Sequence, residues 1–549
     1  MYLIRKTSAG KSLVPQTIAF ICSGISVILV PLIGLGCHQV DKASSFAEHN
    51  VEAYHIDEHH GDDAKLLRKR LNGMSKEEAK EISIMLYVSP QKLKANSDWV
   101  NQLENLAEKG LISMFCIDEA HYVQQAGRSF RMEFVEAVES IAMLIRSMPS
   151  PVPCIAMSAT FTERDRNRVT ELLGGRTPVI SAGDLGRRST TFTCHVSGRP
   201  STSLKSSAVQ HLRQSPTKQQ IFYTNSCRTA EGPLLDTAQN VLDTNQNHGV
   251  PAFSAAGSFT GEDGLMLKMG KMNAFSDYGI AGSDDSVNDS LPSYQIMVCT
   301  GAAEAGISSN SVYHVKQIGL PASFHVLSQN LGRVNRQQMV VDPDTFTYEV
   351  HLSFECLISL LVRTMRNDDA AERTQQVSDM KSVLNLLLTP SECYHSALER
   401  HFEVHEDPNK GPCEAYCTYC RDDGMKHFTH LFHVRKLISF LTKNIQQQQT
   451  TAMTPSQFIQ SLKKEARNIF HKDDIPVREV GPIHGLALQL YARDIIGIQV
   501  AEATKVGTPH FNRNHLRVTL PAKDFGDEVG FMPVYTVLES YHGLNTVDE

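Results

Sequence analysis

The stretch Phe115–Phe134, FCIDEAHYVQQAGRSFRMEF, places an apolar strand directly before two adjacent carboxylates. Asp118 and Glu119 repel each other, and burial at the end of a strand adds to that cost. Such a pair is expected where a cation and a substrate are held beside the carboxylates. A lone acidic pair is more often a solvated strand end, so the rest of the chain must supply the other half of a site.

Short apolar segments of β character alternate with longer amphipathic segments before about residue 356. This alternation predicts an α/β protein with parallel sheets, and the segments are numerous enough for two such domains. We expect strands over residues 2–4, 26–30, 82–89, 111–117, 153–160, 219–225, 294–300 and 312–319. We expect domains over residues 1–185, 186–355, 356–424 and 425–549, the third helical and the fourth of mixed character.

Length and composition are those of an ordinary multidomain globular protein. The chain has 549 residues, 41% of them hydrophobic and 21% charged, and its net charge is −7. This excludes a polycation, so nucleic acid would have to be bound by local basic patches. The 12 cysteines are scattered except for a group near residues 393–420, which favours a reducing compartment. Residues 276–293 are small, polar and acidic, as in a surface insertion.

Residues 13–40 permit two interpretations, because they contain no Asp, Glu, Lys or Arg. A run of this length can span a bilayer, which would make the protein a membrane-anchored ATPase. The alternative is a buried helix, a turn at Ser23-Gly24 and a buried parallel strand that ends at Pro31. Ser, Gly and Pro divide the run into pieces of those lengths, so we expect no membrane span.

The segment TSAGKS (Thr7–Ser12) follows a short strand and precedes an apolar helix. In this context Gly-Lys-Ser can cradle phosphates: Lys11 reaches the terminal phosphates and Ser12 ligates Mg²⁺. A full phosphate loop has Gly where Arg5 stands, and a plain helix cap is the alternative. Together with the acidic pair the segment predicts a nucleotide site, in which Asp118 holds Mg²⁺ and Glu119 orients the attacking water.

An ordered set of segments resembles the motifs of RecQ-type DNA helicases of superfamily two. The segments are TSAGKS (7–12), VILVPLIGLGCHQV (27–40), LYVSPQKL (86–93), DEAH (118–121), QQAGRSFRMEF (124–134), SAT (158–160), IFYTNS (221–226), VCTGAAEAGISSNSV (298–312) and SQNLGRVNR (328–336). The resemblance covers about residues 1–420 and implies two RecA-like domains, over 1–185 and 186–355, that face each other across ATP. It implies an ATP-dependent 3′-to-5′ helicase of recombination and repair, acting on single-stranded DNA and on branched or duplex junctions. The location would be the nucleus in a eukaryote and the cytoplasm otherwise.

The resemblance also assigns roles to residues. ATP would be bound by Thr7, Gly10, Lys11 and Ser12; catalysis would use Asp118, Glu119, Gln329, Arg333 and Arg336; coupling would use His121, Ser158 and Thr160; DNA would contact Gln125, Phe130 and Arg131. The two arginines would act as fingers that neutralise charge during phosphoryl transfer. The family's loop Trp is Ala126 here, which predicts weaker unwinding because a stacking face is lost. Alternatively, Phe130 and Phe134 are core residues.

Four cysteines follow the spacing C-x19-C-x3-C-x2-C: Cys393, Cys413, Cys417 and Cys420. Four thiolates form a closed tetrahedral site of the structural Zn²⁺ type, and His395 is an alternative ligand to Cys393. RecQ proteins carry a zinc subdomain at this place, and often a winged-helix domain after it. We therefore expect a winged-helix-like domain over 425–549, or a small helical domain of another purpose.

The chain departs from the family pattern at several positions. Met1 lies ten residues before Lys11, so the family's adenine-holding segment is absent from this sequence. Glu304 and Asn335 stand where the family has Gly. We expect a divergent, N-terminally truncated RecQ-type helicase, with a degenerate nucleic-acid-binding module as the alternative.

Overall fold

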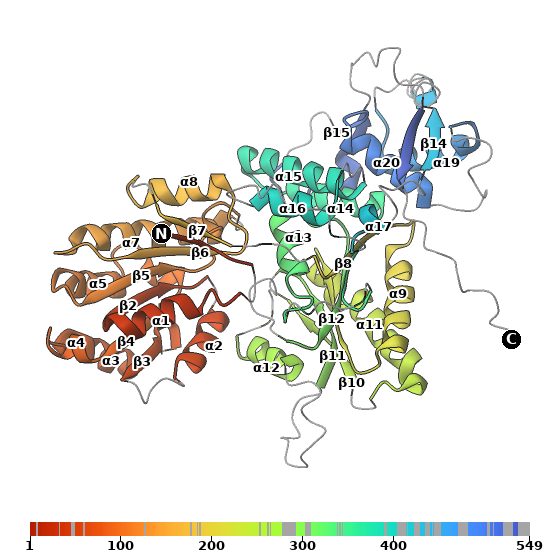
Figure 1. Ribbon diagram of the computed structural model, residues 1–549. Helices are drawn as coiled ribbons and strands as arrows, with labels where there is room; N and C mark the ends of the chain where they lie inside the picture. Colours follow the sequence, from red (N-terminus) through yellow and green to blue (C-terminus); the bar gives the residue numbers. More distant parts are fainter. Residues whose placement is uncertain are drawn as a thin grey trace.

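A computed structural model gives the structure of the chain. It describes residues 1–6, 9–31, 33–44, 50–58, 61–125, 128–175, 178–183, 185, 188–251, 254–260, 263, 265–276, 293–301, 309–337, 339, 342, 344–388, 392–402, 413, 416–421, 429–433, 440, 441, 443, 452–469, 481–501, 506–508, 510–519 and 531–535. Figure 1 shows two α/β units side by side, with helices and a C-terminal part next to the second unit.

The first unit is built on a seven-stranded sheet of order β3-β4-β2-β5-β6-β1-β7, in which all neighbouring strands are parallel. The strands are β1 Tyr2–Ile4, β2 Gly24–Leu29, β3 Val51–His55, β4 Ser83–Val88, β5 Ile112–Ile117, β6 Cys154–Ser158 and β7 Ile180–Ala182. The helices of this unit are α1 Leu13–Cys22, α2 Ile33–Ser44, α3 Gly61–Gly73, α4 Glu78–Glu81, α5 Asp98–Glu108, α6 Tyr122–Gln125, α7 Arg128–Ser147 and α8 Glu163–Leu172. Apolar clusters cover both faces of the sheet, as a parallel sheet requires.

The second unit is built on a six-stranded parallel sheet of order β10-β11-β9-β12-β13-β8. Its strands are β8 Thr191–Val196, β9 Gln219–Thr224, β10 Ser254–Phe259, β11 Ser293–Cys299, β12 Val312–Ile318 and β13 Thr347–Leu352. Its helices are α9 Pro200–Gln214, α10 Cys227–Glu231, α11 Pro233–Asn245, α12 Leu265–Ser276 and α13 Phe324–Leu331. The expected α/β class with two parallel sheets is confirmed, and all eight predicted strands are present.

Helices α14 Phe354–Met365, α15 Ala370–Leu388, α16 Tyr394–Phe402 and α17 Thr418–Arg421 follow the second sheet. They lie beside it in Figure 1 and share one apolar core with it, which also includes residues of α19 Pro455–Ile469 and α20 Gly481–Ala492. The second sheet and the segments after it are therefore packed as one body.

The described C-terminal residues contain two antiparallel strand pairs. One joins β14 Thr429–His433 to β17 Phe531–Tyr535, and the other joins β15 Gly497–Val500 to β16 Leu516–Thr519. A winged-helix domain contains helices and a β-hairpin, and α19, α20 and the β15–β16 pair are elements of these kinds. The winged-helix assignment stays a prediction, as do the domain boundaries.

The apolar run of residues 13–40 folds as the predicted helix, turn and buried strand, but the helix is only partly buried, because Leu13, Phe20 and Ile21 are exposed. It forms α1, a turn in which Ser23 and Gly24 have φ of 49° and 79°, and β2, whose residues are all buried between β4 and β5. Among the described residues, no helix combines the length and the apolar character needed to cross a bilayer.

Candidate functional site

Three predicted motifs meet at the carboxyl edge of the first sheet. The Gly-Lys-Ser loop follows β1, the DEAH segment follows β5, and SAT ends β6; these strands are neighbours in the order β5-β6-β1. Backbone hydrogen bonds tie the edge together, from Ala120 N to Met157 O at 2.9 Å and from Arg5 N to Ser158 O at 3.3 Å. Because parallel strands end at one edge, segments far apart in sequence form one site.

The described part of the Gly-Lys-Ser segment, residues 9–12, leads directly into α1. Gly10 has φ of 74°, a conformation that glycine adopts without strain, and Lys11 is buried just before α1. Ser12 occupies the N-cap of α1, but its side chain makes no capping hydrogen bond. The alternative role of a helix cap for this serine is therefore not observed. Thr7 lies outside the described residues.

Asp118 is buried and held from two sides. Its Oδ2 accepts a hydrogen bond from Nε2 of Gln39 at 3.1 Å, and its Oδ1 accepts one from the backbone N–H of Glu119 at 2.9 Å. Burial and the neighbouring Glu119 raise the pKa of Asp118 to about 6. A bound divalent cation would lower that pKa, because it stabilises the carboxylate. Gln39 fixes the carboxylate from α2 and was not predicted as a site residue.

Glu119 has φ of 47°, a left-handed conformation that is strained for a residue with a Cβ. Its Oε2 lies 3.3 Å from Nδ1 of His121. Burial raises the pKa of Glu119, but His121 and the charges of Lys11 and Arg333 outweigh it, so the pKa lies below its usual value. The low pKa keeps this carboxylate ionised, and charges from both α/β units contribute to it.

The second unit contributes through α13 and the turn after it. Nε2 of Gln329 donates to Nε2 of His121 at 3.0 Å, so the proton of this imidazole is on Nδ1, which lies 2.9 Å from Oγ of Ser158. Oγ of Ser158 also accepts from the backbone N–H of Thr160 at 3.0 Å. The predicted coupling residues are therefore in contact with one another and with Gln329.

The turn after α13, residues 332–336, contains Arg333 and Arg336, with Asn335 between them. Asn335 has φ of 46°, a left-handed conformation that Gly adopts without strain and that Asn tolerates better than most other residues. Its side chain donates to Oγ of Ser189 at 3.1 Å and accepts from the N–H of Met339 at 2.9 Å. Arg333 is buried near Glu119, and Arg336 is half-buried in the same turn.

The predicted DNA-binding side chains lie outside what the structure describes. Gln125 ends α6, and Phe130 and Arg131 lie in the first turn of α7, but only their backbone is described. Phe134, four residues on, is fully buried, so for this residue the alternative of a core position is correct. Glu304 in the VCTGAAEAG segment also lies outside the described residues.

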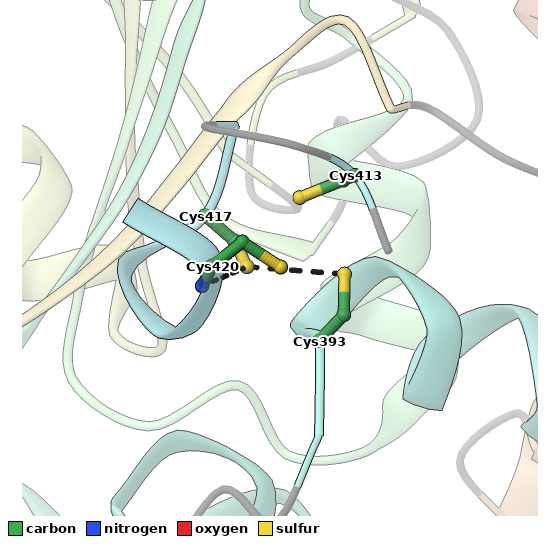
Figure 2. A group of neighbouring side chains, drawn as sticks. All are labelled: Cys393, Cys413, Cys417 and Cys420. Carbon is green, nitrogen blue, oxygen red and sulfur yellow. Dashed lines mark hydrogen bonds between the residues drawn. The ribbon is translucent and has the colours of Figure 1, made fainter. Parts of the chain in front are cut away.

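The four predicted zinc ligands come together (Figure 2). One Sγ atom from each of Cys393, Cys413, Cys417 and Cys420 lies within 4.8 Å of the others. Without a metal ion, the close thiols lower the pKa of Cys393 and raise the pKa values of Cys413 and Cys417, and a bound cation would favour the thiolate at each of them. His395 is not part of this group, and its Nε2 donates to the carbonyls of Thr190 and Tyr416. A four-thiol group with this geometry fits a structural Zn²⁺ ion.

A second titratable cluster lies under α9, on one face of β8, β12 and β13. His195, Glu349 and His351 offer ligand atoms within 4.8 Å of one another. However, Nζ of the fully buried Lys316 lies 2.7 Å from Glu349 Oε2 and also donates to Oγ of Ser207. The ammonium already neutralises this carboxylate, so we interpret the cluster as a structural ion pair and not as a metal site.

We predict that Lys316→Met lowers the Tm of the second unit by roughly 10 °C at pH 7, because it leaves Glu349 charged and buried without its partner. Thermal unfolding followed by circular dichroism measures this. The double variant Lys316→Met/Glu349→Leu, which removes both charges, should recover most of the loss. The ion-pair interpretation is wrong if Lys316→Met alone melts like the wild type.

Known helicases are similar to this chain in sequence. Residues 1–169 match the family model of the DEAD/DEAH box helicase. The RecQ-like DNA helicase BLM of Xenopus laevis is 24% identical over 430 residues, covering 76% of this chain and 28% of that protein. The ATP-dependent DNA helicase RecQ of Pasteurella multocida is 23% identical over 440 residues, covering 80% of this chain and 60% of that protein.

Among solved structures, the helicase Lhr of Mycobacterium smegmatis, bound to single-stranded DNA and AMP-PNP, aligns with a TM-score of 0.45 and 16% identity. That alignment covers 73% of this chain and 51% of the other. This chain spans less than two thirds of the length of each curated relative reported above. The matches in sequence show that residues 1–169 are similar to a DEAD/DEAH box helicase domain, and that about three quarters of the chain is similar to RecQ-family DNA helicases.

Proposed function

We propose that the protein is an ATP-dependent DNA helicase of RecQ type. The observation that carries this proposal is the contact of the two units at the DEAH segment, where Gln329 of the second unit lies 3.0 Å from His121 and His121 lies 3.3 Å from Glu119. A carboxylate at the boundary of two domains, one carrying a lysine and the other carrying arginines, is the arrangement that phosphoryl transfer at such a boundary needs. The homology to RecQ-family helicases supports the same activity.

The residues of the chain then have distinct tasks. Lys11 and the N–H groups at the start of α1 would bind the terminal phosphates of ATP, and Ser12 and Asp118 would hold Mg²⁺, which supplies charge neutralisation when bound. Glu119, ionised near neutral pH, would take a proton from the attacking water. Arg333 and Arg336 would neutralise charge that develops on the phosphoryl oxygens.

Hydrolysis would be coupled to movement of the second unit through Gln329 and His121. Their hydrogen bond, 3.0 Å long, joins α13 of the second unit to the DEAH segment of the first. A movement of either residue would therefore shift the other. Gln125, Phe130 and Arg131 would contact single-stranded DNA next to this segment, and Ala126 would provide less stacking than the family's Trp.

The finer parts of the proposal rest on the resemblance. These are 3′-to-5′ movement, action on branched or duplex junctions in recombination and repair, and a location in the nucleus of a eukaryote or in the cytoplasm otherwise. The four cysteines would hold one structural Zn²⁺ ion that folds the segment around α16 and α17.

Unwinding of tailed duplexes tests this function. With ATP and Mg²⁺, the chain should separate a duplex with a 3′ single-stranded tail and leave a duplex with a 5′ tail intact. Strand separation is followed by gel shift of a labelled strand, with Lys11→Ala as the inactive control. Equal unwinding of the 3′-tailed and the 5′-tailed duplex would contradict the proposed 3′-to-5′ movement.

The second candidate is a DNA-binding module that has lost its motor, and Ala126 is the observation that favours it. That module would bind the 3′-tailed duplex but would neither separate it nor hydrolyse ATP. Binding without hydrolysis, in a folded sample that contains zinc, would support this candidate.

A further inference from the structure

His325 lies on α13 where three parts of the protein meet. Its side chain is buried, and its Nε2 lies 3.4 Å from Oδ2 of Asp165, on α8 of the first unit. That same Oδ2 accepts two hydrogen bonds from Thr162, at 2.9 Å from the backbone N–H and at 2.7 Å from Oγ1, which hold the start of α8. The imidazole therefore contacts a carboxylate that is fixed in the opposite unit.

The same imidazole also packs against the DEAH histidine. The rings of His325 and His121 are stacked, with centroids 5.9 Å apart and planes at 29°. His121 is itself held by Gln329, one turn further along α13, and lies 3.3 Å from Glu119. His325 thus supports, from a second direction, the group that contacts the proposed catalytic carboxylate.

The third contact of His325 reaches the zinc-binding segment. The ring of Phe402, at the end of α16, meets His325 edge to face with centroids 4.9 Å apart. Cys393, one of the four clustered cysteines, directly precedes α16. A short series of contacts therefore joins a proposed zinc ligand to the DEAH segment through a single helix.

A neighbouring contact offers an internal comparison. Phe324 precedes His325 on α13 and stacks on His401 of α16, with ring centroids 4.3 Å apart. Phe324 thus belongs to the same contact between α13 and α16. The ring contact with His121 and the polar contact with Asp165, both in the first unit, are made by His325. Changes at the two positions can separate loosening of α16 from loss of support for His121.

We propose that His325 is a positioning residue that couples the zinc-binding segment to ATP turnover, by joining α16 to His121 and to Asp165. The expected effect on kcat rests on the proposed ATPase function. The expected effect on the stability of α8 rests on the contacts alone. The proposal predicts that His325 acts on the rate of the chemical step and not on ATP affinity, since its ring packs against His121, which lies 3.3 Å from Glu119.

Steady-state kinetics of full-length, zinc-loaded variants test the proposal. His325→Leu should lower kcat about tenfold, with the KM for ATP changed less than about twofold. His325→Gln, which keeps an N–H donor toward Asp165, should recover part of the loss. Phe402→Leu should lower kcat about threefold alone and add little to His325→Leu, because both act through one contact series. Phe324→Leu should stay within about twofold of the wild type.

Hydrogen exchange gives a readout that needs no activity. Amides of α8 should exchange faster in His325→Leu than in Phe324→Leu, since only the former loses the contact with Asp165. The proposal is overturned if the two variants match in kcat and in α8 exchange, or if the effects of His325→Leu and Phe402→Leu are additive. If the wild type hydrolyses no ATP, the proposed function fails, while the exchange comparison still decides the structural part. If His325→Leu does not fold, His325→Gln against Phe324→Leu decides both parts.

Discussion

Glu119→Gln is expected to bind ATP like the wild type and to hydrolyse it about a hundred- to ten-thousand-fold more slowly. The amide has nearly the shape of the carboxylate but takes no proton from water. The surroundings of Glu119 keep its pKa low, so the wild-type group is a base over the whole neutral range. Removing the charge also relieves its repulsion with Asp118, so ATP binding should not suffer.

A fluorescent ATP analogue measures binding and phosphate release measures turnover. Lys11→Ala should lose both, since the ammonium is needed to hold the phosphates. Glu108→Gln, an exposed change of the same kind on α5, should behave like the wild type. Turnover that survives in Glu119→Gln would show that another group orients the water.

Cys417→Ser should remove zinc from the protein and lower its Tm by more than about 10 °C. Cys417 is fully buried, and the chain at this residue pairs with Phe192 of β8. The backbone N–H of Phe192 donates to Tyr416 O at 2.9 Å, so loss of the metal site disturbs the edge of the second sheet. Cys393, Cys413 and Cys417 also belong to the core shared by the second sheet and the following helices.

Metal content by mass spectrometry and thermal unfolding check this prediction together. Cys22→Ser is the matched control, because Cys22 is exposed at the end of α1 and should change neither quantity. One zinc ion per chain is expected in the wild type. A Cys417→Ser variant that is stable and still contains zinc would refute the four-thiol site.

Apolar strands of both sheets were predictable from sequence, whereas polar ones were not. β8 and β13 were missed because their residues alternate: Tyr348 and Val350 face the apolar core, while Glu349 and His351 face Lys316. Short apolar runs identify strands that are buried between two apolar layers, and here one layer is an ion-pair network. β10 was missed because its sequence, SAAGSF, is mostly small residues.

The site was predictable where motifs are local. Lys11, Asp118 and Glu119 lie beside strand ends whose sequence is distinctive, and parallel topology brings them together. Gln39 lies in the motif-like segment 27–40, but its role and that of His325 were not predicted, because each acts through a contact with a residue more than 75 positions away. Such contacts depend on how helices dock, which spacing in the sequence does not encode.

The rate of ATP hydrolysis with and without single-stranded DNA tests the central claim most directly. The wild-type chain, zinc-loaded and folded, is compared with Glu119→Gln as the baseline. Our account predicts hydrolysis well above that baseline and a further rise on addition of single-stranded DNA. Hydrolysis no faster than Glu119→Gln, with or without DNA, would contradict a working motor and leave a protein that binds DNA without turning over ATP.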